Sequence, residues 1–323
     1  MENSVAMNGK TIRKESGRVG RSLIFYTLIF YFFVMGSAIL ESLLCIIKNP
    51  NLTDQSPECQ QILEKMQSSG TSSIVGVCVG LLFLLLFFRK RITIKTVFQK
   101  EKSMHITTFF QVLCVFLGIQ LVSTVGWILM EKGFHLFGYS AMNSMEIASS
   151  TGETVSMFLY ASIIGPIAEE LVYRGFVLRS FQKYGKVAAI FVSALVFGFM
   201  HGNIPQGVFA FCIGIVLAYV AIEYSIGWSI ALHIINNCIF GDILQRLISG
   251  FGKQNQNIIN TVISAIFAAF AVVILWKKRE EIKTFCNENK AQKGTYRYIF
   301  TAIGMLVFML AELWGGISML EKI

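Results

Sequence analysis

Three charged residues lie close together inside an apolar segment of the chain. Glu169, Glu170 and Arg174 fall within the otherwise largely hydrophobic stretch 163–175. A charge near the middle of a membrane costs roughly 2.5–3.5 kcal/mol on insertion scales, so such residues are usually paired or functional. In a helix, the four-residue spacing places Glu170 and Arg174 on one face, whereas Glu169 is rotated by about 100°. Pro166 is expected to kink the helix before the carboxylates. A purely structural ion pair is the competing interpretation.

Two further polar pairs occur at helical spacing in nearby apolar segments. His201 follows Phe197 by four residues, and Asn237 follows His233 by four. Each pair alone is explained by packing or by hydrogen bonds between helices. Together with Glu169, they comprise the groups that water-driven amide hydrolysis requires: a carboxylate that takes a proton from water and donors that hold the oxyanion. A metal site built from Glu169, His201 and His233 is the alternative assembly.

Other catalytic motifs are absent from the sequence. It has no His-Glu-x-x-His zinc motif and no Gly-x-Ser-x-Gly nucleophile elbow. The seven cysteines include no Cys-x-x-Cys pair and no metal-ligand spacing. Most of them lie in apolar stretches, where cysteine is usually a small core residue, so we expect neither a structural disulfide nor a thiol nucleophile.

The polar constellations resemble the motifs of the type II CAAX prenyl endopeptidase family, which has bacterial relatives linked to bacteriocin processing and immunity. Order and spacing agree over about residues 155–240, and Gly-Pro-Ile-Ala before the glutamates also fits. The three motifs are Glu-Glu-x-x-x-Arg at Glu169, Glu170 and Arg174, Phe-x-x-x-His at Phe197 and His201, and His-x-x-x-Asn at His233 and Asn237.

The resemblance implies an intramembrane, glutamate-dependent endopeptidase that works without a bound metal or other cofactor. It implies that Glu169 with His201 activates water, and that His233 and Asn237 stabilise the oxyanion. The other two residues of the first motif would orient the site. Eukaryotic members cut prenylated C-terminal tails, whereas many bacterial relatives act in peptide maturation or self-immunity. The expected partner is therefore a hydrophobic or lipidated peptide or protein in the bilayer.

The elements that must position these residues are membrane-spanning helices. The chain of 323 residues is 54% hydrophobic and only 15% charged, and its mean hydropathy is +0.61. Roughly 20 apolar residues are needed to cross a bilayer as a helix. The sequence predicts an all-α, polytopic transmembrane helix bundle with eight or nine spans. The nine candidate spans are 23–47, 71–88, 106–130, 154–178, 187–201, 206–224, 226–247, 257–276 and 297–316.

The basic residues predict the orientation of the chain. The net charge of +9 comes from clusters between apolar segments rather than from a nucleic-acid-binding motif, so no nucleic-acid partner is expected. All major clusters fall on one side if the N-terminus is cytoplasmic and nine spans place the C-terminus outside. These clusters lie at 10–21, 89–102, 179–186 and 277–283.

These patterns divide the chain into four regions of a multi-pass protein of the cell membrane. The regions are a basic cytoplasmic N-terminus (1–22), N-terminal transmembrane helices (23–152), a CAAX-protease-like catalytic core (153–247) and C-terminal transmembrane helices (248–323).

Two other functions are alternatives to the endopeptidase. A binding protein without catalysis, such as an immunity or regulatory protein, is the first alternative. A transporter with a carboxylate proton relay is a third hypothesis, and the lack of an internal repeat disfavours it.

Overall fold

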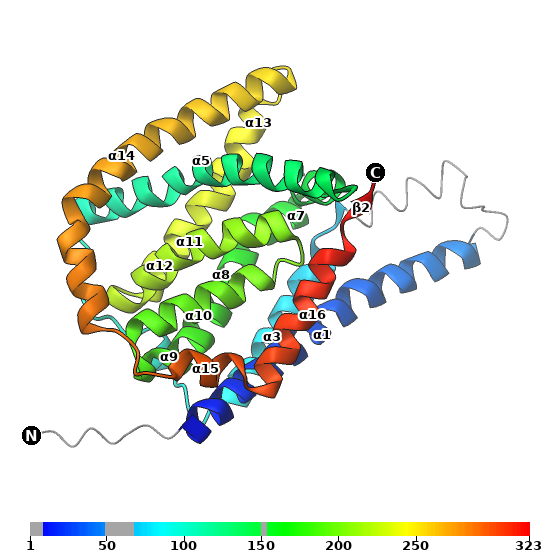
Figure 1. Cartoon of the computed structure of the whole chain (residues 1–323). Helices are drawn as coiled ribbons and strands as arrows, with labels where there is room; N and C mark the ends of the chain where they lie inside the picture. The colour runs from blue at the N-terminus through cyan, green and yellow to red at the C-terminus, as the bar shows by residue number, and fades with distance from the viewer. Residues whose placement is uncertain (1–8, 49–67, 150–153) are drawn as a thin grey trace, which may run out of the picture.

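The protein folds as a helical bundle in a computed structural model that describes residues 9–48, 68–149 and 154–323 (Figure 1). Two of its helical segments are composite, because α-helical and π-helical turns alternate without a break. The elements before the first composite segment are α1 (Gly9–Lys48), α3 (Thr71–Phe88), α4 (Ile94–Val97), α5 (Ile106–Leu136), β1 (Tyr139–Ser140) and α6 (Met142–Ser149).

The first composite segment carries both glutamates, and the second carries His233 and Asn237. The first consists of α7 (Val155–Leu159), the π-helix η1 (Tyr160–Ile164), α8 (Gly165–Glu170), the π-helix η2 (Leu171–Leu178), α9 (Arg179–Phe181) and the 3₁₀ turn η3 (Gln182–Tyr184). Between the two lie α10 (Lys186–Phe199) and α11 (Ile204–Glu223). The second consists of α12 (Ile226–Ile234), the π-helix η4 (Ile235–Ile243) and α13 (Leu244–Ile248). The chain closes with α14 (Lys253–Glu288), α15 (Thr295–Phe300), α16 (Ile303–Ser318) and β2 (Glu321–Lys322).

In the described part of the chain, seven helices are long and apolar enough to cross a membrane, as in a multi-pass membrane protein. Many of their large apolar side chains are exposed, as expected for surfaces that face lipid. Two shorter apolar helices, α10 and α16, accompany them, so every predicted span corresponds to a helix. The seven are Gly9–Lys48, Thr71–Phe88, Ile106–Leu136, Val155–Tyr184, Ile204–Glu223, Ile226–Ile248 and Lys253–Glu288.

The helix boundaries differ from the expected spans at both ends of the chain. The first helix begins at Gly9, so residues 9–22 of the expected polar N-terminal region continue into the first span, while residues 1–8 lie outside the described part. The expected continuous span 297–316 is broken, because Ala302 between α15 and α16 adopts an extended backbone conformation. Because of this break, α16 begins at Ile303, and its first turn lies against α1.

The connection after α5 contains the strand β1 and the short helix α6. After α5 ends, β1 pairs antiparallel with β2 from the C-terminal end of the chain. Glu131 near the end of α5 accepts hydrogen bonds from the Ser140 hydroxyl at 2.5 Å and the Ala141 amide at 3.0 Å. The Glu131 bonds hold β1 against the end of α5, and the pairing of β1 with β2 joins this region to the chain after α16 (Figure 1).

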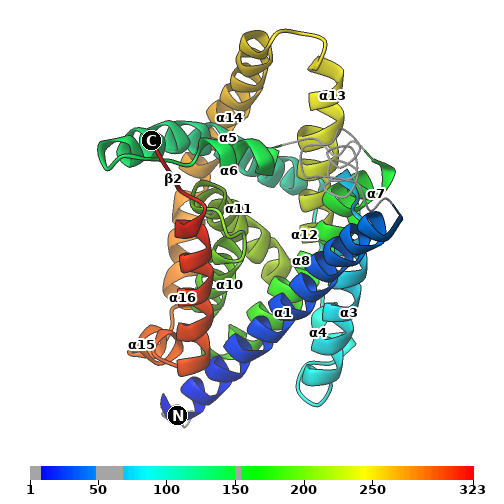
Figure 2. The same ribbon diagram turned by 90° about the vertical axis from the view of Figure 1, so that its right-hand side faces the viewer.

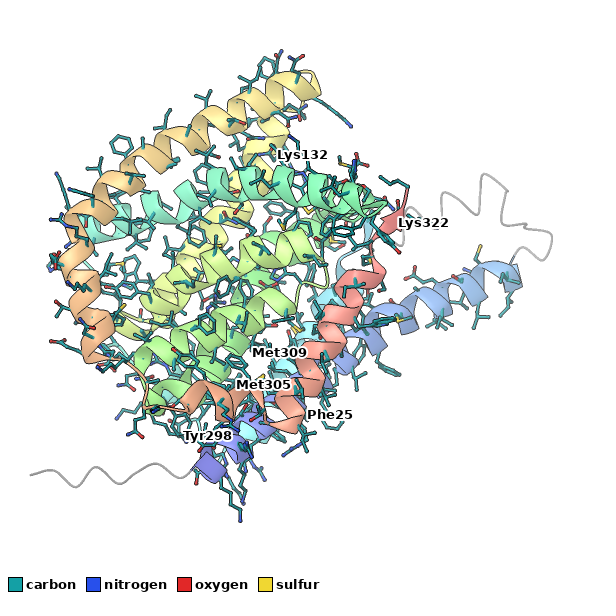
Figure 3. All side chains as sticks on the ribbon, viewed as in Figure 1. Phe25, Lys132, Tyr298, Met305, Met309 and Lys322 are labelled. Carbon is teal, nitrogen blue, oxygen red and sulfur yellow. The ribbon has the colours of Figure 1, made fainter. Side chains whose placement is uncertain are left out.

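Helices α1 and α16 meet through glycine near the N-terminal end of α1 and separate farther along (Figure 2). Gly20 lies so close to Gly304 that a β-carbon on Gly20 would overlap the Gly304 backbone. Arg13 of α1 lies 5.4 Å from the ring centroid of Tyr298 in α15, and Figure 3 shows Tyr298 at this end of the bundle. Small residues let helix backbones approach closely in membranes, so this contact anchors α16.

We expect Gly20→Ala to destabilise the protein, because the added methyl group has no space against α16. Overpacking of this kind typically costs about 1–3 kcal/mol. Gly36→Ala in the same helix is the matched control, since a β-carbon there meets open space and alanine favours a helix. Thermal unfolding in detergent should show a lower midpoint for Gly20→Ala alone. Equal midpoints for both variants would contradict the glycine contact.

The core of the bundle lies among α8, η2, α10, α11 and α12, and the other long helices cover it (Figures 1 and 2). Buried residues from these central elements, such as Val172, Phe197 and Leu217, are 0–1% exposed and form one cluster. On the outside, α5 packs along α14. The central helices are the ones that carry the polar residues, so the polar side chains lie in an apolar interior.

Candidate active site

The predicted ion pair of Glu170 and Arg174 is present and lies at the centre of the bundle. Both side chains are 0% exposed, and Arg174 Nη1 donates to Glu170 Oε1 at 2.9 Å. The second oxygen of Glu170 accepts a hydrogen bond from the Ser229 hydroxyl of α12. Arg174 Nη2 also donates to the Gly214 carbonyl of α11 at 3.2 Å. A buried carboxylate is tolerable here because a cation and hydrogen-bond donors surround it.

Phe197 connects this pair to both histidines. The Arg174 guanidinium lies 4.4 Å from the centroid of the Phe197 ring, in a cation–π geometry. The same ring makes edge contacts with His201 at 4.9 Å and with His233 at 5.8 Å between centroids. The phenylalanine of the Phe-x-x-x-His motif is thus a shared packing surface for Arg174 and the two imidazoles.

His233 lies between the two neighbouring glutamates. Its Nδ1 is 3.0 Å from Glu170 Oε1, and its Nε2 is 3.6 Å from Glu169 Oε2. Because the Glu170 carboxylate only accepts, Nδ1 of His233 must carry a hydrogen. With Nδ1 bonded to Glu170, the other ring nitrogen, Nε2, faces Glu169. The Glu169 side chain keeps 34% of its surface exposed, whereas that of Glu170 is completely buried. The adjacent carboxylates therefore have different surroundings, as their rotation around the helix predicts.

His201 lies in the turn after α10, and its described contacts are to Phe197 rather than to a glutamate. Its Nδ1 is 2.8 Å from the Phe197 carbonyl oxygen. Since a carbonyl only accepts, Nδ1 is the donor, and the neutral ring presents an unprotonated Nε2. In the described part of the chain, the ion-pair contact of Glu169 is to His233. The expected pairing of Glu169 with His201 to activate water stays a prediction.

Asn237 is held by hydrogen bonds to a backbone carbonyl and to a neighbouring side-chain amide. Its Nδ2 donates to the Ala161 carbonyl at 3.1 Å, and its Oδ1 accepts from Asn236 at 2.9 Å. Asn236 in turn accepts from Gln120 of α5 at 2.8 Å. Among the described hydrogen bonds, none joins Asn237 to a glutamate or a histidine. Its role in holding an oxyanion also stays a prediction.

Three polar residues of this region were missed from the sequence. Ser229 lies four residues before His233, so its position on the same helix face was a usable signal. Gln120 and Asn236 gave a weaker signal, because a single amide in an apolar helix is usually a packing residue. Gln120 and Asn236 are hydrogen-bonded to each other from different helical segments, and spacing along one helix does not reveal such a contact.

The site is flanked by π-helical turns. The turn η1 ends directly before Gly165 and Pro166, where a kink was expected, and η2 begins directly after Glu170. The turn η4 begins two residues after His233. Such turns are rare and occur frequently at functional sites, because the extra residue shifts which side chains face a given direction. Here they change the winding on both segments that carry the polar groups.

In the described residues, no group of three or more His, Cys, Asp or Glu side chains is arranged to hold a metal ion. The alternative set of Glu169, His201 and His233 is therefore not assembled as ligands. The described cysteines are all free, and Cys59 lies outside the described residues.

Comparisons with known proteins point to one part of the chain. The family model for the type II CAAX prenyl endopeptidase Rce1-like proteins matches residues 151–239, which include all six predicted site residues. A 74-residue segment is 40% identical to UPF0177 protein YbdJ of Lactococcus lactis subsp. lactis (strain IL1403). That segment covers 22% of this chain and 31% of the relative. No solved structure matches the chain. Neither the family description nor the name of the relative refers to a bacteriocin.

Proposed function

We propose, on the premise that residues 151–239 form a type II CAAX prenyl endopeptidase Rce1-like domain, that this protein is an intramembrane endopeptidase. The arrangement of His233 carries the proposal, because it lies between the buried Glu170 and the partly exposed Glu169 inside an apolar bundle. One carboxylate is held by Arg174 and Ser229, and the other is accessible for proton transfer. A simple structural ion pair does not require the second carboxylate beside the imidazole.

Each step of the proposed reaction assigns a proton. Glu169 takes a proton from water as the water oxygen attacks the carbonyl carbon of the scissile amide, and the unprotonated Nε2 of His201 helps to hold this water. The negative charge on the carbonyl oxygen is stabilised by donors from His233 and Asn237. When the C–N bond breaks, the proton on Glu169 passes to the leaving amine. Water is thus divided between the two peptide products.

The charges around His233 support its role as a donor. Nδ1 already donates to Glu170, so a second donor at Nε2 requires an imidazole that carries both hydrogens. Two carboxylates, Glu169 and Glu170, and one guanidinium, Arg174, leave one net negative charge. His233 has a carboxylate oxygen opposite each ring nitrogen, so both nitrogens face hydrogen-bond acceptors.

The proposed substrate is a peptide with a hydrophobic or lipidated segment that lies in the bilayer. Its support is an apolar cavity of about 250 Å³ between α10, α11 and α16. Phe199 and Asn203, which flank the turn that carries His201, line this cavity together with Glu312 of α16. Binding an apolar segment next to the site would position the scissile bond.

The proposed protein is a multi-pass component of the cell membrane with eight or nine crossings and a cytoplasmic N-terminus. The seven long helices are joined by α10 and α16, which are about 21 and 24 Å long at 1.5 Å per residue. Counting both as crossings places the C-terminus outside, and the basic clusters support this orientation. A C-terminal fusion to a reporter that is active only outside the cytoplasm tests it, and an inactive reporter at normal expression contradicts it.

The proposal is tested by comparing protein termini in cells that produce either the wild-type protein or the Glu169→Ala variant at equal levels. Mass spectrometry of N-terminal and C-terminal peptides should reveal new termini only with the wild-type protein, and these termini identify the substrate. Identical termini in the two strains would contradict the endopeptidase and favour a role by binding alone.

A further inference from the structure

Three side-chain amides form a continuous hydrogen-bonded chain from α5 to η1. Gln120 Nε2 donates to Asn236 Oδ1 at 2.8 Å, and Asn236 Nδ2 donates to Asn237 Oδ1 at 2.9 Å. Asn237 Nδ2 then donates to the Ala161 carbonyl at 3.1 Å. The chain therefore begins outside the family-matched residues and ends one turn before the helix that carries Glu169.

The direction of every amide in this chain follows from the Ala161 carbonyl. A backbone carbonyl only accepts, so Asn237 must present its NH₂ group to it. The oxygen of Asn237 then faces Asn236, which must donate, and the oxygen of Asn236 faces Gln120, which must also donate. Reversing any one amide would place two oxygens or two NH₂ groups opposite each other. The orientation of Asn237 is thus determined by groups on three elements.

The consequence concerns the unused hydrogen of Asn237. Its NH₂ group has two hydrogens, and the described hydrogen bonds use one, to Ala161. Its oxygen faces Asn236 and accepts from it, whereas the second N–H remains available as a donor to a ligand. Asn237 is four residues after His233, on the same side of the segment. A donor that is oriented before the substrate binds stabilises developing charge without reorganisation.

We propose that Gln120 is a positioning residue that acts through Asn236 to keep the free N–H of Asn237 directed at the reacting carbonyl. The inference rests on the proposed function, since it assigns Asn237 as an oxyanion donor. Without Gln120, the oxygen of Asn236, a residue only 8% exposed, loses its donor. Asn236 is then free to turn its amide, and Asn237 keeps only its bond to the Ala161 carbonyl, so one bond instead of two holds the direction of its free N–H.

The test uses the full-length protein in lipid nanodiscs and a peptide spanning a cleavage site that depends on Glu169. Gln120→Met has a similar length but lacks the donor, and we expect it to lower kcat about 10–100-fold with KM changed less than about twofold. This is a fraction of the 10²–10³-fold effect typical of losing an oxyanion donor. In an Asn237→Ala background, Gln120→Met should have little further effect, because the group that it positions is gone.

Two further variants separate positioning from general damage. Gln120→Glu, which places an acceptor opposite the Asn236 oxygen, should lower kcat at least as much and covers the case in which Gln120→Met fails to fold. Gln245→Met is the matched control, because Gln245 also bonds an asparagine on another helix, Asn260, but lies outside the site. Wild-type kcat in both Gln120 variants, or effects that add fully to that of Asn237→Ala, would overturn the proposal. Failure of the endopeptidase itself appears separately, as the lack of any Glu169-dependent cleavage by the wild-type protein.

Discussion

Glu169→Gln should lower the rate of peptide cleavage by about 10²–10⁴-fold, which is the usual contribution of a general base. Glutamine has nearly the same size and hydrogen-bonds at the same position, but it does not take a proton from water at neutral pH. Because the Glu169 side chain is 34% exposed and pairs loosely with His233 at 3.6 Å, the substitution should leave the fold intact. Steady-state cleavage of the identified peptide by purified protein measures the effect.

The matched control for this prediction is Glu281→Gln. Glu281 lies on α14, where its exposed carboxylate pairs with Lys278, so the same chemical change occurs far from the site. The two variants should have equal thermal midpoints and very different cleavage rates. Substantial cleavage by well-folded Glu169→Gln would exclude Glu169 as the base and would make His233 or His201 the next candidate.

Arg174→Met should reduce the free energy of unfolding by about 3–5 kcal/mol, the range found when one partner of a buried ion pair is removed. Glu170 would keep its bonds to Ser229 and His233 but would lose its only described guanidinium partner. The cation–π contact with Phe197 and the bond to the Gly214 carbonyl would disappear as well. Because these contacts join four central elements, the loss affects the whole bundle. Denaturant unfolding in detergent micelles measures it.

Two comparisons separate this pair from an ordinary surface charge. In Glu170→Gln/Arg174→Met the unpaired carboxylate is removed, so part of the lost stability should return. Arg279→Met on α14 is the control for the size and charge change, since both Arg279 and its partner Glu280 are exposed and such pairs contribute little. A loss below about 1 kcal/mol for Arg174→Met would show that the pair is not important for stability.

The local pattern of the sequence was sufficient for the helices and for contacts within one helix. Long apolar segments must form helices in a bilayer, because every backbone group needs an internal partner there, and the all-helical architecture is confirmed. The spacing of Glu170 and Arg174 predicted their ion pair for the same local reason. The break at Ala302 was not predictable in this way, since the apolar run continues through it. It allows Gly304 to contact Gly20, and that contact depends on the position of another helix.

The charged cluster, its motif partners and their restriction to membrane helices were thus determined by the sequence itself. Only the tertiary structure decided that His233 lies between Glu169 and Glu170, and that Gln120 reaches Asn236 from α5. The physical reason is that helical periodicity determines which face a side chain occupies. Which neighbour it meets depends on how the helices cross and on the extra residues of the π-helical turns, which shift that face within a single segment.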